Sequence, residues 1–423
     1  MLDVCGSILA PHTGDAPLDK QILQAREAVR AGGAPAVALE RLGWLFVAKA
    51  RANFDDSFYT LAEQCALCLD SRQPGDPGAM LLRGHVLHNL HRFKEAELLA
   101  RRLVMTRGAP FDHGLLGDAL MELGQLSEAA AAYQRMMDLR PDSRALARAA
   151  HLRWLKGDMA GAVAAMQEAA RSVGSRDTES AAWMHTRLGF YHFATSEAAL
   201  AHEACAAALR LVTNYAPALL LQGRAHLAAG ECAEAVEPLL RAARSNPAPE
   251  YLWALAEALF EAGRFEEARA MHAELRHHGA ERDPRTFALY LSTRREDLEV
   301  ALSLAQHELK QRGDVFTHDA LAWCLVRADR LDEAHSHMER ALAEGTKDGR
   351  LFFHAAVIAA KAGRTAEARH FRARAESLVQ TLLPSERLQL QGAVPDSDSE
   401  PKHASATELV PETARAFVSA PAP

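Results

Sequence analysis

Apolar residues recur along most of this chain at the three- and four-residue spacing of amphipathic α-helices, and the pattern itself repeats. One alanine returns in similar helical surroundings at intervals of 33 or 34 residues, with a single longer interval of 39. Twelve residues before each of these alanines lies a small residue, with Leu289 as the one exception, and a glycine often lies between the two. Small facing residues let two helices approach closely, and glycine ends the first helix. The sequence therefore predicts helix–turn–helix units anchored by Ala96, Ala129, Ala162, Ala201, Ala235, Ala268, Ala301, Ala334 and Ala368.

The unit from Pro110 to Ser143 resembles the tetratricopeptide repeat, with Leu116, Gly117, Leu120, Gly124, Ala129, Tyr133 and Pro141 at that family's offsets. The segment from Pro217 to Pro247 is similar, and Ala62 extends the ladder upstream. The stretches Arg41 to Asp70 and Pro249 to Ala360 also resemble uncharacterised bacterial proteins built almost wholly of such repeats. The resemblance implies an all-α fold, a right-handed superhelical solenoid of about ten repeats.

Three regions follow from this pattern. Residues 37–382 are expected to form the solenoid, preceded by a flexible segment, 1–36, with a short capping helix near 19–30. Residues 383–423 mix Pro, Ser, Asp, Glu and Ala without apolar periodicity and are expected to be disordered. The one long interval falls in the polar stretch 172–180, which predicts a loop that can act as a hinge.

Composition and charge argue against some classes of partner and some cell compartments. The net charge of −7 and the pI near 6.3 leave no basic excess, which argues against nucleic-acid binding. Six cysteines without framework spacing indicate free thiols in a reducing compartment. The absence of a signal peptide and of any long apolar run predicts a cytoplasmic protein that does not insert into membranes.

The resemblance also predicts which surface binds partners, because positions 2, 5, 9 and 12 of each repeat line the concave face in this family. Four of the five tryptophans fall there, which favours a groove that holds a partner segment by aromatic anchors. Alternatively, the rings fill gaps between adjacent first helices. The family's Lys and Asn pattern for gripping a peptide carboxylate is missing. The predicted concave residues are His85, His88, Phe111, Asp118, His151, Trp154, Trp183, Phe190, Phe193, Arg224, Trp253, Glu257, Phe260, Tyr290, Phe316, Trp323 and Phe353.

Catalytic and metal-binding patterns are weak. His85, His88 and His91 recur on one predicted helix without a matching carboxylate or thiol, and Cys65 and Cys68 lack a second pair. No phosphate-binding loop or nucleophile elbow is present. We therefore predict a non-catalytic scaffold or adaptor for other proteins or peptides, with no catalytic residue, cofactor or metal. The alternatives are a sensor of a small peptide or metabolite and a metal-dependent enzyme around His85, His88 and His151. The partner and the oligomeric state do not follow from the sequence.

Overall fold

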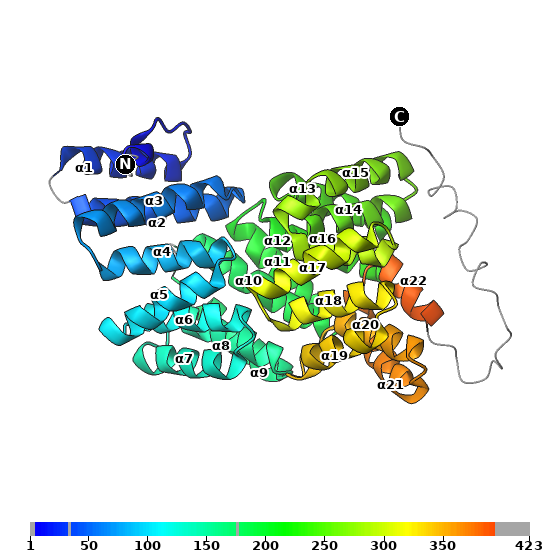
Figure 1. Cartoon of the computed structure of the whole chain (residues 1–423). Coiled ribbons are helices and arrows are strands. Elements are labelled where there is room, and N and C mark those ends of the chain that lie inside the picture. Colours follow the sequence, from blue (N-terminus) through cyan, green and yellow to red (C-terminus); the bar gives the residue numbers. More distant parts are fainter. Residues whose placement is uncertain (1–4, 33–34, 175–176, 394–423) are drawn as a thin grey trace.

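The computed structural model describes residues 5–32, 35–174 and 177–393, and within these residues the chain forms helices and no strands (Figure 1). Ten antiparallel helix pairs follow one another, which confirms the predicted all-α solenoid of about ten repeats. The first helices of the pairs are α2 (Pro35–Asn53), α4 (Pro77–Asn89), α6 (Pro110–Glu122), α8 (Ser143–Leu155), α10 (Thr178–Ala194), α12 (Ala216–Ala229), α14 (Pro249–Glu261), α16 (Pro284–Arg294), α18 (Val315–Arg327) and α20 (Gly349–Lys361). The second helices are α3 (Ser57–Arg72), α5 (Phe93–Thr106), α7 (Leu126–Leu139), α9 (Met159–Ser172), α11 (Ala198–Leu211), α13 (Cys232–Ser245), α15 (Phe265–Arg282), α17 (Leu298–Gln311), α19 (Leu331–Leu342) and α21 (Thr365–Glu376).

The alanine ladder marks the contact within each pair. Every alanine of the ladder, including Ala62, is at most 2% exposed. The facing glycines have equally little room, since a Cβ atom on Gly117 would collide with the ring of Tyr133. Small residues therefore hold the two helices of each pair close together, as the sequence pattern predicts.

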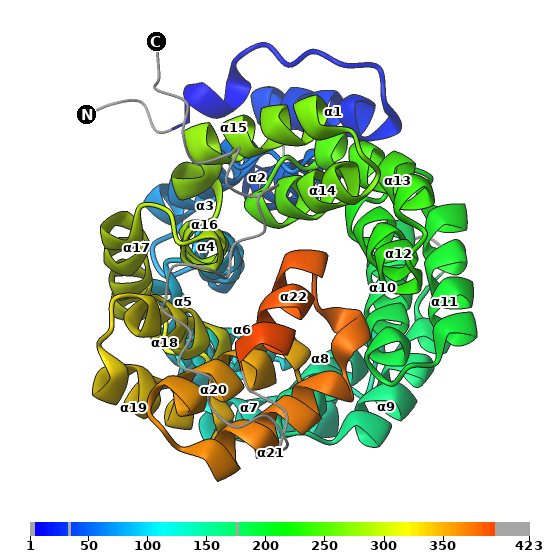
Figure 2. The ribbon, with the colours of Figure 1, turned by 90° about the vertical axis from the view of Figure 1, so that its right-hand side faces the viewer.

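The pairs coil into a superhelix that is longer than one full turn. Viewed along the superhelix axis, the first helices form an inner ring and the second helices an outer ring (Figure 2). The loops around Gly313 and Gly345 contact the ends of α6 and α8, which lie one turn of the superhelix earlier in the chain. The two turns thus lie directly against each other.

We call this line of contact the turn seam. The Gly313 backbone N–H donates to the Glu122 carbonyl at 3.1 Å, and the Thr346 hydroxyl donates to the Leu155 carbonyl at 2.5 Å. An ion pair between Lys156 and Glu344, at 2.8 Å, lies beside it. These contacts join segments about 190 residues apart and fix the pitch of the superhelix.

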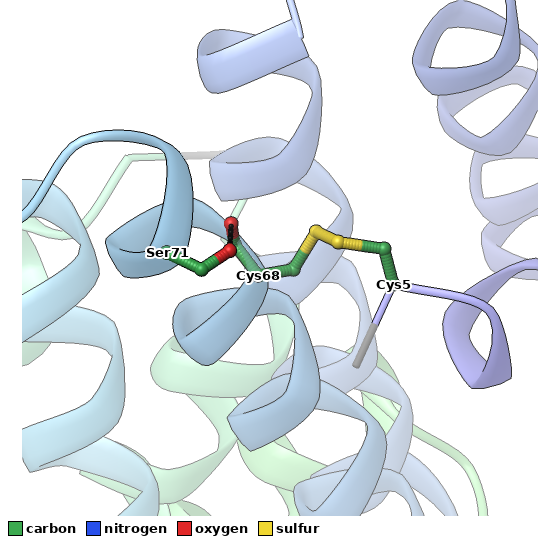
Figure 3. The surroundings of a disulfide bond; sticks show 3 residues. All are labelled: Cys5, Cys68 and Ser71. Carbon is green, nitrogen blue, oxygen red and sulfur yellow. Dashed lines mark hydrogen bonds between the residues drawn. A yellow bond between two sulfur atoms is a disulfide. The ribbon is translucent and has the colours of Figure 1, made fainter. Parts of the chain in front are cut away.

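The N-terminal segment is more ordered than the sequence suggests. Helix α1 (Pro17–Ala31) covers the start of the solenoid, and a 3₁₀ turn, η1 (Ser7–Leu9), buries Ile8 completely. Cys5 forms a disulfide with Cys68 on α3 (Figure 3). The prediction that all the cysteines are free thiols is therefore wrong for this pair, because a sequence separation of 63 residues hides their proximity. Cys65 is free and buried.

The C-terminal segment also departs from the prediction. Sequence composition predicts disorder from residue 383, yet a 3₁₀ turn, η2 (Val379–Thr381), and helix α22 (Pro384–Ala393) are well formed. Helix α22 lies inside the ring of first helices (Figure 2). Leu382, Leu383 and Leu390 are at most 4% exposed. The polar composition misleads here because ion pairs and hydrogen bonds to distant helices hold much of this segment in place. Residues 394–423 lie outside the described part of the chain.

Candidate functional site

The segment 380–389 contacts the inner side of six consecutive first helices, from α10 to α20. We call the surface that these helices present to the segment the C-terminal groove. Helix α22 does not extend the stack as another outer or inner layer, because it crosses the inside of the ring and touches groups from many repeats (Figure 2). The C-terminal groove is therefore a surface that holds a helical peptide, here one of the chain's own.

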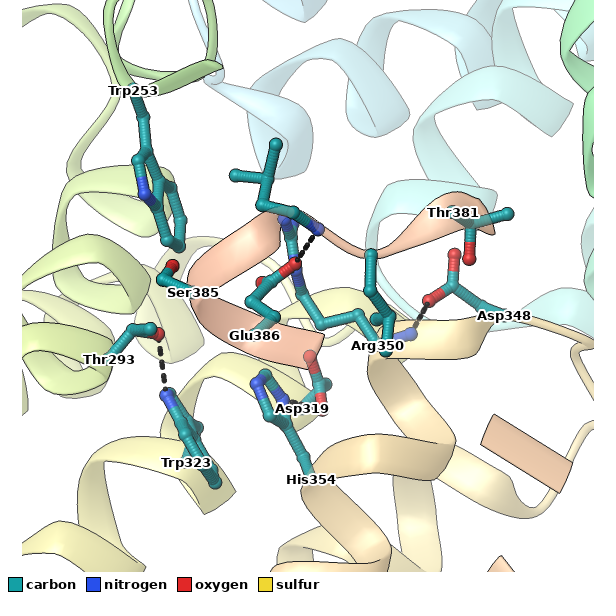
Figure 4. Close-up of polar contacts among 12 residues, drawn as sticks. Trp253, Thr293, Asp319, Trp323, Asp348, Arg350, His354, Thr381, Ser385 and Glu386 are labelled. Carbon is teal, nitrogen blue, oxygen red and sulfur yellow. Dashed lines mark hydrogen bonds and ion pairs between the residues drawn. The ribbon is translucent and has the colours of Figure 1, made fainter. Parts of the chain in front are cut away.

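An ion pair lies at the centre of this contact. The Arg350 side chain on α20 donates to the Glu386 carboxylate on α22 at 2.6 Å, and the Glu386 side chain is fully buried (Figure 4). The second carboxylate oxygen of Glu386 accepts from the Leu383 backbone N–H at 2.8 Å, which caps the start of α22. Burial alone would raise the pKa of Glu386, but the charge and hydrogen bond of Arg350 hold this pKa below its usual value. The carboxylate is thus charged and satisfied inside the ring.

A second carboxylate of the groove accepts hydrogen bonds from the first turn of α22. Glu257 on α14 accepts from the Ser385 backbone N–H at 3.0 Å and from the Ser385 hydroxyl at 2.5 Å. The indole N–H of Trp253 donates to the same carboxylate at 2.9 Å. Burial raises the pKa of Glu257, although these donors oppose the shift. An acceptor with this position suits the free N–H groups at the start of a bound helix.

Near the end of α22, the Gln389 side chain binds an arginine and a backbone carbonyl of the groove. Arg327 on α18 donates to the side-chain oxygen of Gln389 at 2.5 Å, and the Gln389 amide donates to the Thr293 carbonyl on α16 at 3.0 Å. Arg327 also lies over the ring of Trp323, with its guanidinium carbon 3.9 Å from the ring centroid. Leu390, the next residue, is 2% exposed. Adjacent residues of α22 are therefore held in two ways, Gln389 by hydrogen bonds and Leu390 by burial of its apolar side chain.

The segment before α22 is held through one of its backbone carbonyls and one of its side-chain amides. Arg224 on α12 donates to the Thr381 carbonyl at 2.5 Å. The Gln380 amide donates to the carbonyls of Phe193 and Ala194 at the end of α10, both at 3.1 Å. These contacts fix where η2 crosses the groove, and they use acceptors at the free C-terminal end of a helix.

Three of the predicted concave residues thus contact the bound segment: Arg224 and Glu257 through their side chains, and Phe193 through its backbone carbonyl. Four predicted aromatic residues do not reach any surface: Trp253, Tyr290, Trp323 and Phe353 are at most 1% exposed. Their rings pack against neighbouring first helices, as in the Trp253–Tyr290 contact with ring centroids 5.7 Å apart. Their assignment as anchors for a partner stays a prediction, because these exposures are those with α22 in the groove, where Trp253 and Ser385 donate to the same carboxylate.

The inner face of the first repeats is lined by polar pairs that link adjacent first helices. Arg148 on α8 donates to Asp118 on α6 at 2.6 Å, and Arg187 on α10 contacts the ring nitrogen of His151 at 3.1 Å. His85 similarly contacts Arg51 at 2.9 Å. Burial, together with the charge of Arg187, lowers the pKa of His151 to about 3, so its ring is neutral at ordinary pH.

The remaining predicted residues have varied surroundings. Trp154 is 4% exposed and stacks on Phe316 across the turn seam, with ring centroids 5.5 Å apart. Phe193 is 5% exposed, whereas Phe260 is 41% exposed at the end of α14. The other four are partly buried: His88, Phe111, Trp183 and Phe190.

The three histidines that suggested a metal site have other neighbours. His85 contacts Arg51, whereas His88 and His91 pack against the ring of Phe93. Within the described residues, no group of three or more His, Cys, Asp or Glu side chains is placed to hold a metal ion. Across the same part of the chain, no helix combines the length and apolar character needed to cross a membrane.

Several residues of the C-terminal groove are not among the predicted concave residues. Arg350 and Thr293 contact the bound segment, and on the repeat grid they occupy positions 2 and 12 of their repeats, which are predicted concave positions. A search of the grid for charged and polar residues as well as aromatic ones would have found Arg350. Thr293 acts through its backbone carbonyl toward Gln389, which no side-chain pattern can reveal.

Paired helices, close-packed alanines and the superhelical coil together define an α-solenoid. The sequence model of the tetratricopeptide repeat family matches residues 115–177 and 220–275. This match confirms the prediction that the chain contains tetratricopeptide repeats.

Several solved structures are similar to the chain at low identity, whereas no curated protein sequence matches it. A chain of the APC/C hetero-tetramer Cut9–Hcn1 shares 15% identity, with a TM-score of 0.47; the similarity covers 81% of this chain and 60% of that one. The human IFIT1 dimer with PPP-AAAA shares 13% identity over 85% of this chain and 86% of that one, with a TM-score of 0.48. Yeast Tom70 shares 14% identity over 88% and 90%, with a TM-score of 0.33.

Proposed function

We propose that the protein is a non-catalytic interaction scaffold or adaptor that binds a segment of a partner protein along the inner face of its superhelix. One observation carries this proposal: the inner helices from α10 to α20 already hold a helical segment through backbone and side-chain contacts. A groove that receives an amphipathic helix is a common mode of peptide recognition. We place this activity in the cytoplasm, as the sequence predicts.

Site-specific photo-crosslinking tests the proposal without disturbing α22. A benzophenone amino acid replaces Phe111 or Phe260 on the inner helices, where an aromatic side chain already stands. The controls carry the same amino acid at Leu98 or Met105 on the outer helix α5, which are 69% and 81% exposed. We expect partner adducts from the inner positions in cells. Adducts from the outer positions alone would contradict the proposal.

A further inference from the structure

We infer that residues 378–393 are a built-in competitor for the C-terminal groove, and that the partner which displaces them is an amphipathic helix of the same pattern, with a glutamate in its first turn. This inference rests on the proposed function and adds the chemistry of the partner. It also implies that the groove alternates between a self-occupied and a partner-bound state.

The contacts indicate an interchangeable ligand rather than a structural layer of the solenoid. The described segment is held along its length by long-range pairs, such as Ser385 with Glu257, which lies 128 residues earlier. The helix is short, and its outward residue Leu388 is 63% exposed. The groove side of each contact comes from helices α10 to α20, so a peptide of the same sequence supplied from another protein meets the same groups.

The same contacts define what such a peptide must carry. A glutamate at the third helical position satisfies Arg350, and a glutamine three residues later bridges Arg327 and the Thr293 carbonyl. A leucine directly after the glutamine is buried, as Leu390 is here. Arg224 adds a donor for a backbone carbonyl ahead of the helix. Of the three arginines that contact the occupant, only Arg350 pairs with a carboxylate. The groove therefore selects a glutamate at this one position of the helix rather than a net negative charge.

Competition between the two occupants gives a direct test with the full-length chain. The probe is a fluorescent synthetic peptide of residues 378–393, measured by anisotropy. Leu390→Glu places a charge at a buried contact and should release α22, whereas Leu388→Glu changes an exposed residue of the same helix and serves as the matched control. We expect the peptide to bind the Leu390→Glu variant at least ten times more tightly than wild type or the control. A Glu386→Lys peptide should not bind.

Two results would overturn the inference. The peptide binds the Leu390→Glu variant no more tightly than wild type, or the Glu386→Lys peptide binds as well as the native one. If circular dichroism shows that Leu390→Glu disrupts the solenoid, the double variant Glu386→Gln, Gln389→Ala replaces it, because it removes polar contacts only. Partner adducts at Phe111 or Phe260 together with no peptide binding would refute competition while leaving the proposed function intact.

Discussion

Gly124, at the end of α6, lies directly against the carbonyl oxygen of Gly313 in the next turn of the superhelix. Its φ of +77° is a backbone conformation that favours glycine, and the same is true of Gly157, which faces Gly345. The repeat family explains the glycine as a helix terminator, but in this chain two of these glycines also form the turn seam.

The seam can be tested by adding one methyl group. Gly124→Ala should lower the free energy of unfolding by about 1–3 kcal/mol more than Gly230→Ala, because only the former meets a carbonyl oxygen. Gly230 is the matched control, since its φ is +78° and no heavy atom lies within 4 Å of the added Cβ. Urea unfolding measures both. Equal losses would show that the turns do not touch at this point.

The buried ion pair should be sensitive to loss of one partner. Arg350→Ala leaves the Glu386 carboxylate without its cation inside the ring, at a cost of about 3 kcal/mol. Arg330→Ala removes an exposed pair with Glu333 and should leave the unfolding midpoint unchanged. Chemical denaturation compares the two variants. An unchanged midpoint for Arg350→Ala would contradict the burial of this pair.

Histidine burial predicts a loss of stability in mild acid. The pKa of His151 in the fold is lowered to about 3 from 6.5, so on acidification the unfolded chain takes up a proton before the fold can. The stabilisation is complete above about pH 6.5 and decreases as the pH falls toward 3. His151→Gln should reduce the stability difference between pH 7 and pH 5.5 by about 1 kcal/mol, and exposed His277→Gln is the control. No reduction would indicate that His151 is accessible to protons.

The disulfide should stabilise the first repeats. Linking Cys5 to Cys68 closes a loop of 63 residues, which restricts the unfolded chain by up to about 4 kcal/mol. A reductant should therefore lower the melting temperature of wild type and of Cys232→Ser, but not of Cys5→Ser. Six free thiols in the intact protein under non-reducing conditions would be incompatible with the bond.

Sequence pattern predicts the repeats well because their packing is local. Every ladder alanine is buried, and the small residues twelve positions earlier meet side chains of their own unit or the next, such as Gly117 with Tyr133 and Gly84 with Leu115. A fixed interval in the sequence therefore indicates these contacts. The groove occupant depends instead on pairs such as Glu386 with Arg350 and Ser385 with Glu257, which join polar residues from different repeats. Polar composition alone indicates disorder there. The burial of Trp323 likewise depends on neighbouring repeats, since its ring stacks on His354 and its N–H donates to the Thr293 hydroxyl.

Hydrogen exchange along α22 in the wild-type protein tests most directly whether the inner face holds a helical segment. We expect the backbone amides of α22 to exchange far more slowly than an unstructured peptide, and to lose this protection in Leu390→Glu but not in Leu388→Glu. Exchange of the wild-type α22 amides at the rate of an unstructured chain would contradict the account, because the C-terminal groove would then be empty.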